Sequence, residues 1–133
     1  MKPIKLNHLG IAVHDLDTAT QIYQIMGLHV EKIIDVPEQG VRVAFIPLGE
    51  STLELVQPTS PDSAIARFLE KNGEGLHHLA IQVDDIKASL SELKAQEIQL
   101  INETPRRGAE GWIAFLHPKS TGRVLIELVQ TEQ

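Results

Sequence analysis

The feature that most constrains this chain is an internal repeat: the segment NHLGIAV at residues 7–13 returns as HHLAIQV at residues 77–83. Each copy alternates large apolar residues with small or polar ones, a pattern typical of a β-strand that buries one face. His8 and His78 hold the same place in the two copies, on the face opposite the large apolar residues. The repeat is too long for a solenoid, so it predicts two similar modules within one domain.

Two glutamates repeat in the same order as the histidines. The segment LELVQ at residues 53–57 returns as IELVQ at residues 126–130. Strand alternation turns both carboxylates away from the neighbouring apolar residues, so a cleft shared by the two modules would collect all four side chains. Two imidazoles and two carboxylates suit a first-row divalent metal such as Co, Ni, Mn, Fe or Zn. The predicted metal ligands are His8, Glu54, His78 and Glu127.

A strand histidine or glutamate taken alone is more often a hydrogen-bonded or solvent-exposed residue than a ligand. The metal interpretation depends on the joint return of both residue types at matching places. The other histidines lack this support: His77 alternates with His78 and faces the other way, and His14 and His29 are expected at the surface.

The patterns predict an α+β fold of two tandem βαβββ modules, whose curled mixed sheets form a metal-binding cleft. We expect one domain over residues 1–133, with module one at 1–58, a connector at 59–75 and module two at 76–133. Apolar residues at helical spacing follow the first strand of each module. Strands are also predicted over residues 28–36 and 98–102, with a polar loop over 104–111. The predicted helix caps are Asp15 or Asp17, Asp84 or Asp85, and Asp62.

The composition excludes several classes of function. The net charge is −6 and no basic run exceeds Arg106-Arg107, which argues against nucleic-acid binding. No apolar run approaches the roughly 20 residues that span a bilayer, so no membrane partner is expected. The chain has 133 residues and no cysteine, and its first residues enter a strand pattern without a leader pattern. These features predict a cytoplasmic protein without disulfides.

The repeated strands resemble the vicinal-oxygen-chelate (glyoxalase/bleomycin-resistance/dioxygenase) superfamily, in which two βαβββ modules enclose a metal cleft. Within it, the loop segments are similar to those of the methylmalonyl-CoA epimerases, and the resemblance covers nearly the whole chain. It rests on residues 7–13, 37–41, 68–72, 75–79, 117–120 and 125–128.

The resemblance implies a metal-dependent epimerase that removes and returns a proton at the α-carbon of methylmalonyl-CoA through an enolate. His8, Glu54, His78 and Glu127 fall on the ligand positions, with Co2+ as the first choice of metal and Mn2+, Ni2+ or Zn2+ as alternatives. Glu127 is the first choice for proton transfer. Its partner across the cleft is Glu54, with a water or another side chain as the alternative. Some epimerases carry a glutamate proposed as a base where this chain has Val43, and valine cannot transfer a proton.

The resemblance also implies an acyl-CoA substrate and a homodimer. Arg106, Arg107 and Lys119 are candidate cations for the CoA phosphates, although exposed loop charges would give the same pattern. Three alternatives share the fold: a glyoxalase I-type lyase acting on a hemithioacetal, an Fe(II) dioxygenase with two histidines and one glutamate, and a metal-free binding or resistance protein. Two histidines and two glutamates argue against the metal-free alternative, and a fourth ligand argues against the dioxygenase.

Overall fold

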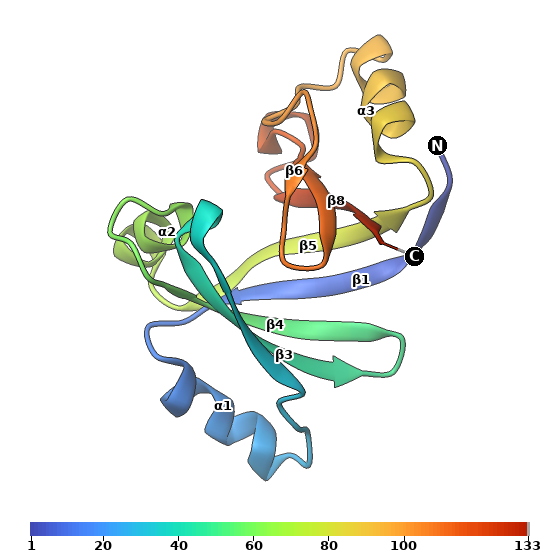
Figure 1. Cartoon of the computed structure of the whole chain (residues 1–133). Helices are drawn as coiled ribbons and strands as arrows, with labels where there is room; N and C mark the ends of the chain where they lie inside the picture. Colours follow the sequence, from blue (N-terminus) through green and yellow to red (C-terminus); the bar gives the residue numbers. More distant parts are fainter. Residues whose placement is uncertain (133) are drawn as a thin grey trace. The chain divides into compact units, whose positions relative to one another are not determined.

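A computed structural model describes residues 1–132 and confirms the α+β fold class (Figure 1). The chain divides into two compact units: the first holds residues 8–77, and the second holds residues 1–7 and those from His78 onward. The boundaries predicted between module one, the connector and module two, after residues 58 and 75, stay a prediction. The helices are α1 (Leu16–Ile25), α2 (Ala64–Asn72) and α3 (Ile86–Ala95), with short 3-10 helices at Pro37–Gln39 and Pro118–Ser120. The strands are β1 (Pro3–Ala12), β2 (Lys32–Val36), β3 (Val41–Leu48), β4 (Ser51–Pro58), β5 (Gly75–Val83), β6 (Arg106–Arg107), β7 (Gly111–Phe115) and β8 (Ile126–Thr131).

The first unit is a mixed sheet in the order β2-β3-β4-β1, in which β1 runs parallel to β4 and the other pairs are antiparallel. Helix α1 begins after Asp15, whose side chain accepts a hydrogen bond from the backbone N–H of Thr18. Its apolar face packs on β3 and β4 (Figure 1). The buried residues of this core are Val13, Leu16, Ala44, Ile46 and Leu55.

The second unit repeats this arrangement in the order β5-β8-β7-β6, with β5 parallel to β8. Helix α3 begins after Asp85, which accepts from the backbone N–H of Ala88. The beginning of β1 belongs to this unit, where the carbonyl of Lys2 accepts from the backbone N–H of Asp84. The buried residues between α3 and the sheet are Val83, Ile86, Leu90, Ala114, Leu116 and Leu128.

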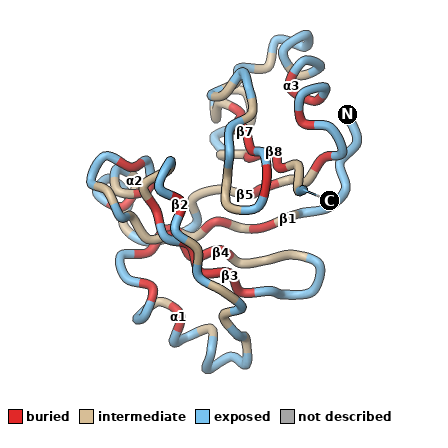
Figure 2. Tube along the Cα trace, in the orientation of Figure 1, coloured by how far each residue is buried: buried red, intermediate tan, exposed pale blue. Residues whose placement is uncertain are grey.

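Burial alternates along the second half of β1, whereas β3, β4 and β8 each bury three or more consecutive residues. Figure 2 shows how burial is distributed along the chain. Strand β3 is the most deeply buried: Phe45 and Ile46 are 1% and 0% exposed. Each such side chain stabilises the fold by about 1.5–3 kcal/mol relative to an exposed one. Along residues 1–132, none of the helices has the length and apolar character needed to cross a membrane.

Four local predictions were wrong. The connector helix is capped by Ser63 and not by Asp62, because the Ser63 hydroxyl accepts from the backbone N–H of Ala66 at 3.0 Å. The strand predicted over 98–102 is reduced to a single bridge between Leu100 and Leu116. The predicted polar loop contains β6, which pairs with β7 as the edge of the sheet. The strand predicted from residue 28 begins only at Lys32.

Candidate metal centre

The first unit brings one predicted histidine–glutamate pair together. In the parallel pairing of β1 with β4, Gly10 stands opposite Glu54, so His8, two residues earlier, shares a face with that carboxylate. Nδ1 of His8 lies 2.9 Å from a carboxylate oxygen of Glu54, a normal hydrogen-bond length. His8 is 6% exposed and Glu54 is 8% exposed. The pair is therefore screened from water and held by the strand register.

The second unit builds an equivalent pair at the same register. In the parallel pairing of β5 with β8, Ala80 stands opposite Glu127, and His78 again lies two residues earlier. Nε2 of His78 lies 3.3 Å from a carboxylate oxygen of Glu127. Glu127 is 4% exposed, and His78 is partly buried. The internal repeat in the sequence thus becomes a repeat of two buried side-chain pairs.

Aromatic rings flank both carboxylates. In the antiparallel pairings, Phe45 stands opposite Glu54 and Phe115 stands opposite Glu127. The ring of Phe115 meets the ring of His78 edge to face, with centroids 5.6 Å apart. Because apolar rings on one side and Gly10 or Ala80 on the other leave little room for water, each carboxylate sits in surroundings of low polarity. Charges in such surroundings interact more strongly than they do in water.

The donor chemistry of these residues fits a divalent metal ion. His8, His78 and Glu127 each offer one ligand atom of the kind that holds such an ion. Imidazole nitrogen and carboxylate oxygen are the ligands that first-row metals accept. The separation of 3.3 Å between His78 and Glu127 also fits, because two ligands each about 2.1 Å from one ion lie roughly 3.0–3.5 Å apart.

The predicted phosphate-binding residues lie on the surface of the second unit. Arg106 and Arg107 form the exposed edge strand β6, and Lys119 is exposed in the 3-10 helix after β7. Arg107 forms an ion pair with Glu132 and lies over the ring of Trp112, 5.4 Å from its centroid. The hydrogen bond with Glu132 raises the pKa of Arg107 above its ordinary value. This arginine is therefore already engaged by a carboxylate.

The remaining predictions from the sequence can be located directly. His14 and His29 are exposed, as expected. Val43 is 4% exposed on β3 and pairs with Val56, so this position is part of the apolar core. His77 lies edge to face with the ring of Phe68, at a centroid distance of 4.9 Å.

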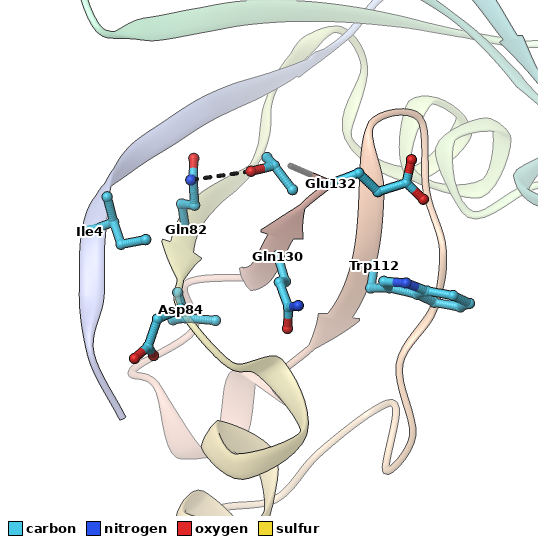
Figure 3. A pocket seen from close by; sticks show the side chains of 8 residues that line it. Ile4, Gln82, Asp84, Trp112, Gln130 and Glu132 are labelled. Carbon is cyan, nitrogen blue, oxygen red and sulfur yellow. Dashed lines mark hydrogen bonds between the residues drawn. The ribbon is translucent and has the colours of Figure 1, made fainter.

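A pocket of about 510 Å³ opens in the second unit, and Figure 3 shows the side chains that line it. Its lining includes Ile4 of β1, Trp112 of β7 and Gln82 of β5, whose side chain donates to the hydroxyl of Thr131 at 3.3 Å. None of the predicted metal ligands lines this pocket. It therefore supplies no further part of the metal centre.

Two glutamines were missed by the sequence reasoning. The side-chain oxygen of Gln57 accepts from the backbone N–H of Leu16 at 2.8 Å, and that of Gln130 accepts from the backbone N–H of Ile86 at 2.9 Å. Each therefore binds the first N–H of the helix that follows a histidine strand. The sequence did contain a signal for these two residues, because glutamine is the last residue of both copies of the repeat, LELVQ and IELVQ.

Comparisons with known proteins point to one superfamily. The family model of the Glyoxalase/Bleomycin resistance protein/Dioxygenase superfamily matches residues 7–115. The mitochondrial methylmalonyl-CoA epimerase of Homo sapiens is 45% identical over 129 residues, which cover 95% of this chain and 73% of that protein. The ethylmalonyl-CoA/methylmalonyl-CoA epimerase of Cereibacter sphaeroides is 41% identical over 130 residues, covering 95% and 97% of the two chains.

A solved structure gives the same result in three dimensions. A methylmalonyl-CoA epimerase in complex with methylmalonyl-CoA and NH4+ superposes with a TM-score of 0.93 at 38% identity. The match covers 98% of this chain and 96% of that one. Sequence and fold therefore point to the same group of proteins over nearly the whole length.

Proposed function

The chain belongs to the glyoxalase/bleomycin resistance protein/dioxygenase superfamily and, within it, to the methylmalonyl-CoA epimerases; from this premise we propose that it interconverts the two epimers of methylmalonyl-CoA. The observation that carries the proposal is the pair of buried histidine–glutamate contacts at the same register in both units. Burying ionisable side chains costs free energy, so their repeated burial is expected where a bound ion or a reaction uses them.

The reaction requires proton transfer at one carbon. The α-carbon of methylmalonyl-CoA lies between a thioester and a carboxylate, so its C–H bond is weakly acidic. When that bond breaks, the proton passes to a base and the electron pair is delocalised onto the thioester oxygen as an enolate. A proton returned to the opposite face completes the inversion, with no net change in atoms or electrons.

The residues that would hold a divalent cation are His8, His78 and Glu127, with Glu54 as the predicted fourth member of the set. When bound, such a cation supplies positive charge that stabilises the negative charge on the thioester oxygen. Co2+ is the first choice, and Mn2+, Ni2+ and Zn2+ accept the same ligands.

We assign the first proton transfer to Glu127. Its carboxylate is 4% exposed, so bulk water competes poorly for the proton that it takes. Val43 contributes no proton carrier, because a buried hydrocarbon side chain occupies the position. Glu54 has two predicted roles: a fourth ligand, or the proton carrier for the other face of the carbon.

Membership of the methylmalonyl-CoA epimerases also supports proposals for how the chain binds its substrate and assembles. The exposed cations Arg106, Arg107 and Lys119 are proposed to meet the CoA phosphates, with Arg107 the weakest candidate because Glu132 already pairs with it. The homodimer and the cytoplasmic location are also proposals. One of the relatives carries a mitochondrial name and another comes from a bacterium, so relatives of this chain work in more than one compartment.

Exchange with solvent tests the reaction directly. In deuterated water, protein loaded with Co2+ should introduce deuterium at the α-carbon of methylmalonyl-CoA, as measured by mass spectrometry. Protein that binds Co2+ but introduces no deuterium would exclude the epimerase function.

Substitution of the proposed base tests its role. Glu127→Gln should lower the exchange rate by about 10²-fold or more at saturating metal, since general-base catalysis contributes on that scale. Glu70→Gln is the matched control, because it removes the same charge from the exposed face of α2. A Glu127→Gln variant with the parent rate at saturating metal would remove Glu127 as the base.

A second candidate function is a glyoxalase I-type lyase. It is favoured by Glu54, because the resemblance to the superfamily implies a glutamate at this position in glyoxalase I and a glutamine there in some epimerases. Turnover of methylglyoxal plus a thiol, without turnover of methylmalonyl-CoA, would select this alternative.

A further inference from the structure

We propose that Lys32 binds the free carboxylate of the substrate, so that its ammonium group favours acyl thioesters of the malonyl type over those without that charge. This inference rests on the proposed epimerase function and assigns Lys32 a role in substrate recognition that is separate from the metal centre.

Lys32 lies on the same face of the sheet as the first histidine–glutamate pair. It stands opposite Phe45 in the pairing of β2 with β3, and Phe45 stands opposite Glu54 in the pairing of β3 with β4. Side chains at paired positions project from the same face, so the lysine, the ring and the carboxylate form one row across three strands. Nζ of Lys32 lies 5.1 Å from the centroid of the Phe45 ring. The positive charge is therefore held over the residue that separates Lys32 from Glu54.

The burial pattern of β2 places Lys32 on the inner face of this strand. Lys32 and Ile34 are partly buried, and Val36 on the same face is 4% exposed. On the other face, Ile33 is 52% exposed and Asp35 is also exposed. Lysine is mostly found at the exposed surface of proteins. Here its charge lies on the face that the first unit encloses, and not on the face toward solvent.

Apolar neighbours would strengthen the attraction between this ammonium group and an anion. The next row on the same face consists of Ile34, Val43 and Val56. Val43 and Val56 are 4% and 5% exposed. Charges interact more strongly beside such groups than they do in water. In these two rows the positive charge belongs to Lys32 and the negative one to Glu54, so a second carboxylate that enters beside Glu54 is drawn toward the lysine.

The corresponding place in the second unit holds a neutral residue. Asn102 follows His78 at the same interval as Lys32 follows the histidine of the first unit. The side-chain oxygen of Asn102 accepts from the backbone N–H of Phe115 at 2.8 Å. This amide therefore supports the backbone of its own unit. The duplicated position carries a cation in the first unit only, which favours a specialised role for the lysine.

The free carboxylate is the anionic group of methylmalonyl-CoA closest to its α-carbon, because the CoA phosphates lie beyond the whole pantetheine arm. Neighbouring strands are about 4.8 Å apart, so the Cα atoms of Lys32 and Glu54 are about 10 Å apart. The ammonium group lies over the ring between them. A substrate whose α-carbon lies beside Glu54 therefore brings its carboxylate, and not its phosphates, within reach of Lys32.

Substrate binding by the Co2+-loaded protein tests this assignment. Lys32→Met removes the charge but keeps the length of the side chain and its apolar contact with Phe45. We expect calorimetry to show a Kd for methylmalonyl-CoA about 10–100-fold higher than that of the parent, because a hydrogen bond to a charged group contributes on that scale. Lys32→Arg should keep most of the parent affinity, since a guanidinium group also binds carboxylates. Lys71→Met, which removes an exposed charge from α2, is the matched control and should leave the Kd unchanged.

Two further ligands distinguish the carboxylate from the phosphates. Propionyl-CoA has the phosphates but no free carboxylate, so the parent and Lys32→Met should bind it with the same Kd. Methylmalonyl-N-acetylcysteamine has the carboxylate but no phosphates, so Lys32→Met should weaken its binding by the same factor as that of methylmalonyl-CoA.

Two results would overturn the inference. An equal loss of affinity for methylmalonyl-CoA and propionyl-CoA would assign Lys32 to the phosphates, and an unchanged Kd for every ligand would leave the lysine without a role in binding. Failure of the parent protein to introduce deuterium into methylmalonyl-CoA would instead contradict the proposed function, so the two failures are distinguishable.

Discussion

The side chain of Gln57 should stabilise the protein by binding the first N–H of α1. The first four N–H groups of a helix have no partner within the helix. Asp15 accepts from the third, that of Thr18, and Gln57 accepts from the first, that of Leu16. Leu16 is 3% exposed, so water has little access to its N–H once Gln57 is removed. We therefore expect Gln57→Met, which keeps the length of the side chain but not its acceptor, to destabilise the fold.

The magnitude follows from the loss of one hydrogen bond to a buried donor. An N–H left without a partner costs about 1–3 kcal/mol, and we take about 1.5 kcal/mol because Gln57 itself is partly exposed. For 133 residues the entropy of unfolding is about 0.28 kcal/mol per kelvin, at roughly 2.1 cal/mol/K per residue. The expected fall in Tm is therefore about 5 °C.

Thermal unfolding followed by circular dichroism or calorimetry measures this fall. Gln57→Glu should keep the parent Tm, because a carboxylate oxygen accepts the same bond and suits the positive end of the helix dipole. Gln24→Met, on the exposed face of α1, controls for the exchange of glutamine for methionine. A Gln57→Met variant within about 1 °C of the parent would refute the reasoning. An equal fall in Gln57→Glu would show that the acceptor is not the cause.

Three further predictions test the backbone, the helix cap and the metal centre. Gly111→Ala should lower the free energy of unfolding by about 3 kcal/mol or more, because φ is +158° and a Cβ would lie 2.3 Å from the carbonyl oxygen of Gln130. Chemical denaturation measures this loss, and Gly75→Ala is the control because a Cβ there meets no atom within 4 Å. The pKa of Asp15 is lowered from 3.8 by the backbone N–H of Thr18 and then by its hydroxyl. A carboxyl group whose pKa is lowered in the folded state stabilises the protein above its unfolded-state pKa, and this stability is lost as the pH falls through the folded-state pKa. The difference in Tm between the parent and Asp15→Ala should therefore be wide at neutral pH and should narrow below pH 3.8. A difference in Tm that does not depend on pH would contradict this cause. Adding Co2+ at 100 times its Kd should stabilise the protein by about 2.7 kcal/mol, which a thermal scan should record as a rise in Tm that a chelator reverses.

The sequence was sufficient to predict the strands that belong to the internal repeat. The histidine strands and both glutamates were placed correctly within their units because alternation fixes which face a strand residue occupies. Strand register could not be derived from one sequence, and it is the register of Gly10 with Glu54 and of Ala80 with Glu127 that brings each carboxylate beside its histidine.

The failures fall where local signals compete. Asp62 and Ser63 are adjacent and both cap helices well, so only the geometry of the loop selects Ser63. Residues 98–102 carry apolar residues at strand spacing, but they form one isolated bridge only, between Leu100 and Leu116, which follows β7. Arg106 and Arg107 form the edge strand β6 that pairs with β7. Their charges suit an exposed edge strand, but two arginines do not make a sequence pattern that predicts a strand.

An internal duplication produces two similar halves, and inversion of a carbon needs a proton carrier on each face of that carbon. The backbone of this chain keeps the two halves equal, since the histidine, the small residue and the glutamate have the same register in each. The difference enters through the side chains. Nδ1 of His8 lies 2.9 Å from a carboxylate oxygen of Glu54, whereas Nε2 of His78 lies 3.3 Å from one of Glu127. Glu127 is the less exposed of the two carboxylates, at 4% against 8% for Glu54, so bulk water competes less for a proton that it carries; this is why we assign the proton to Glu127.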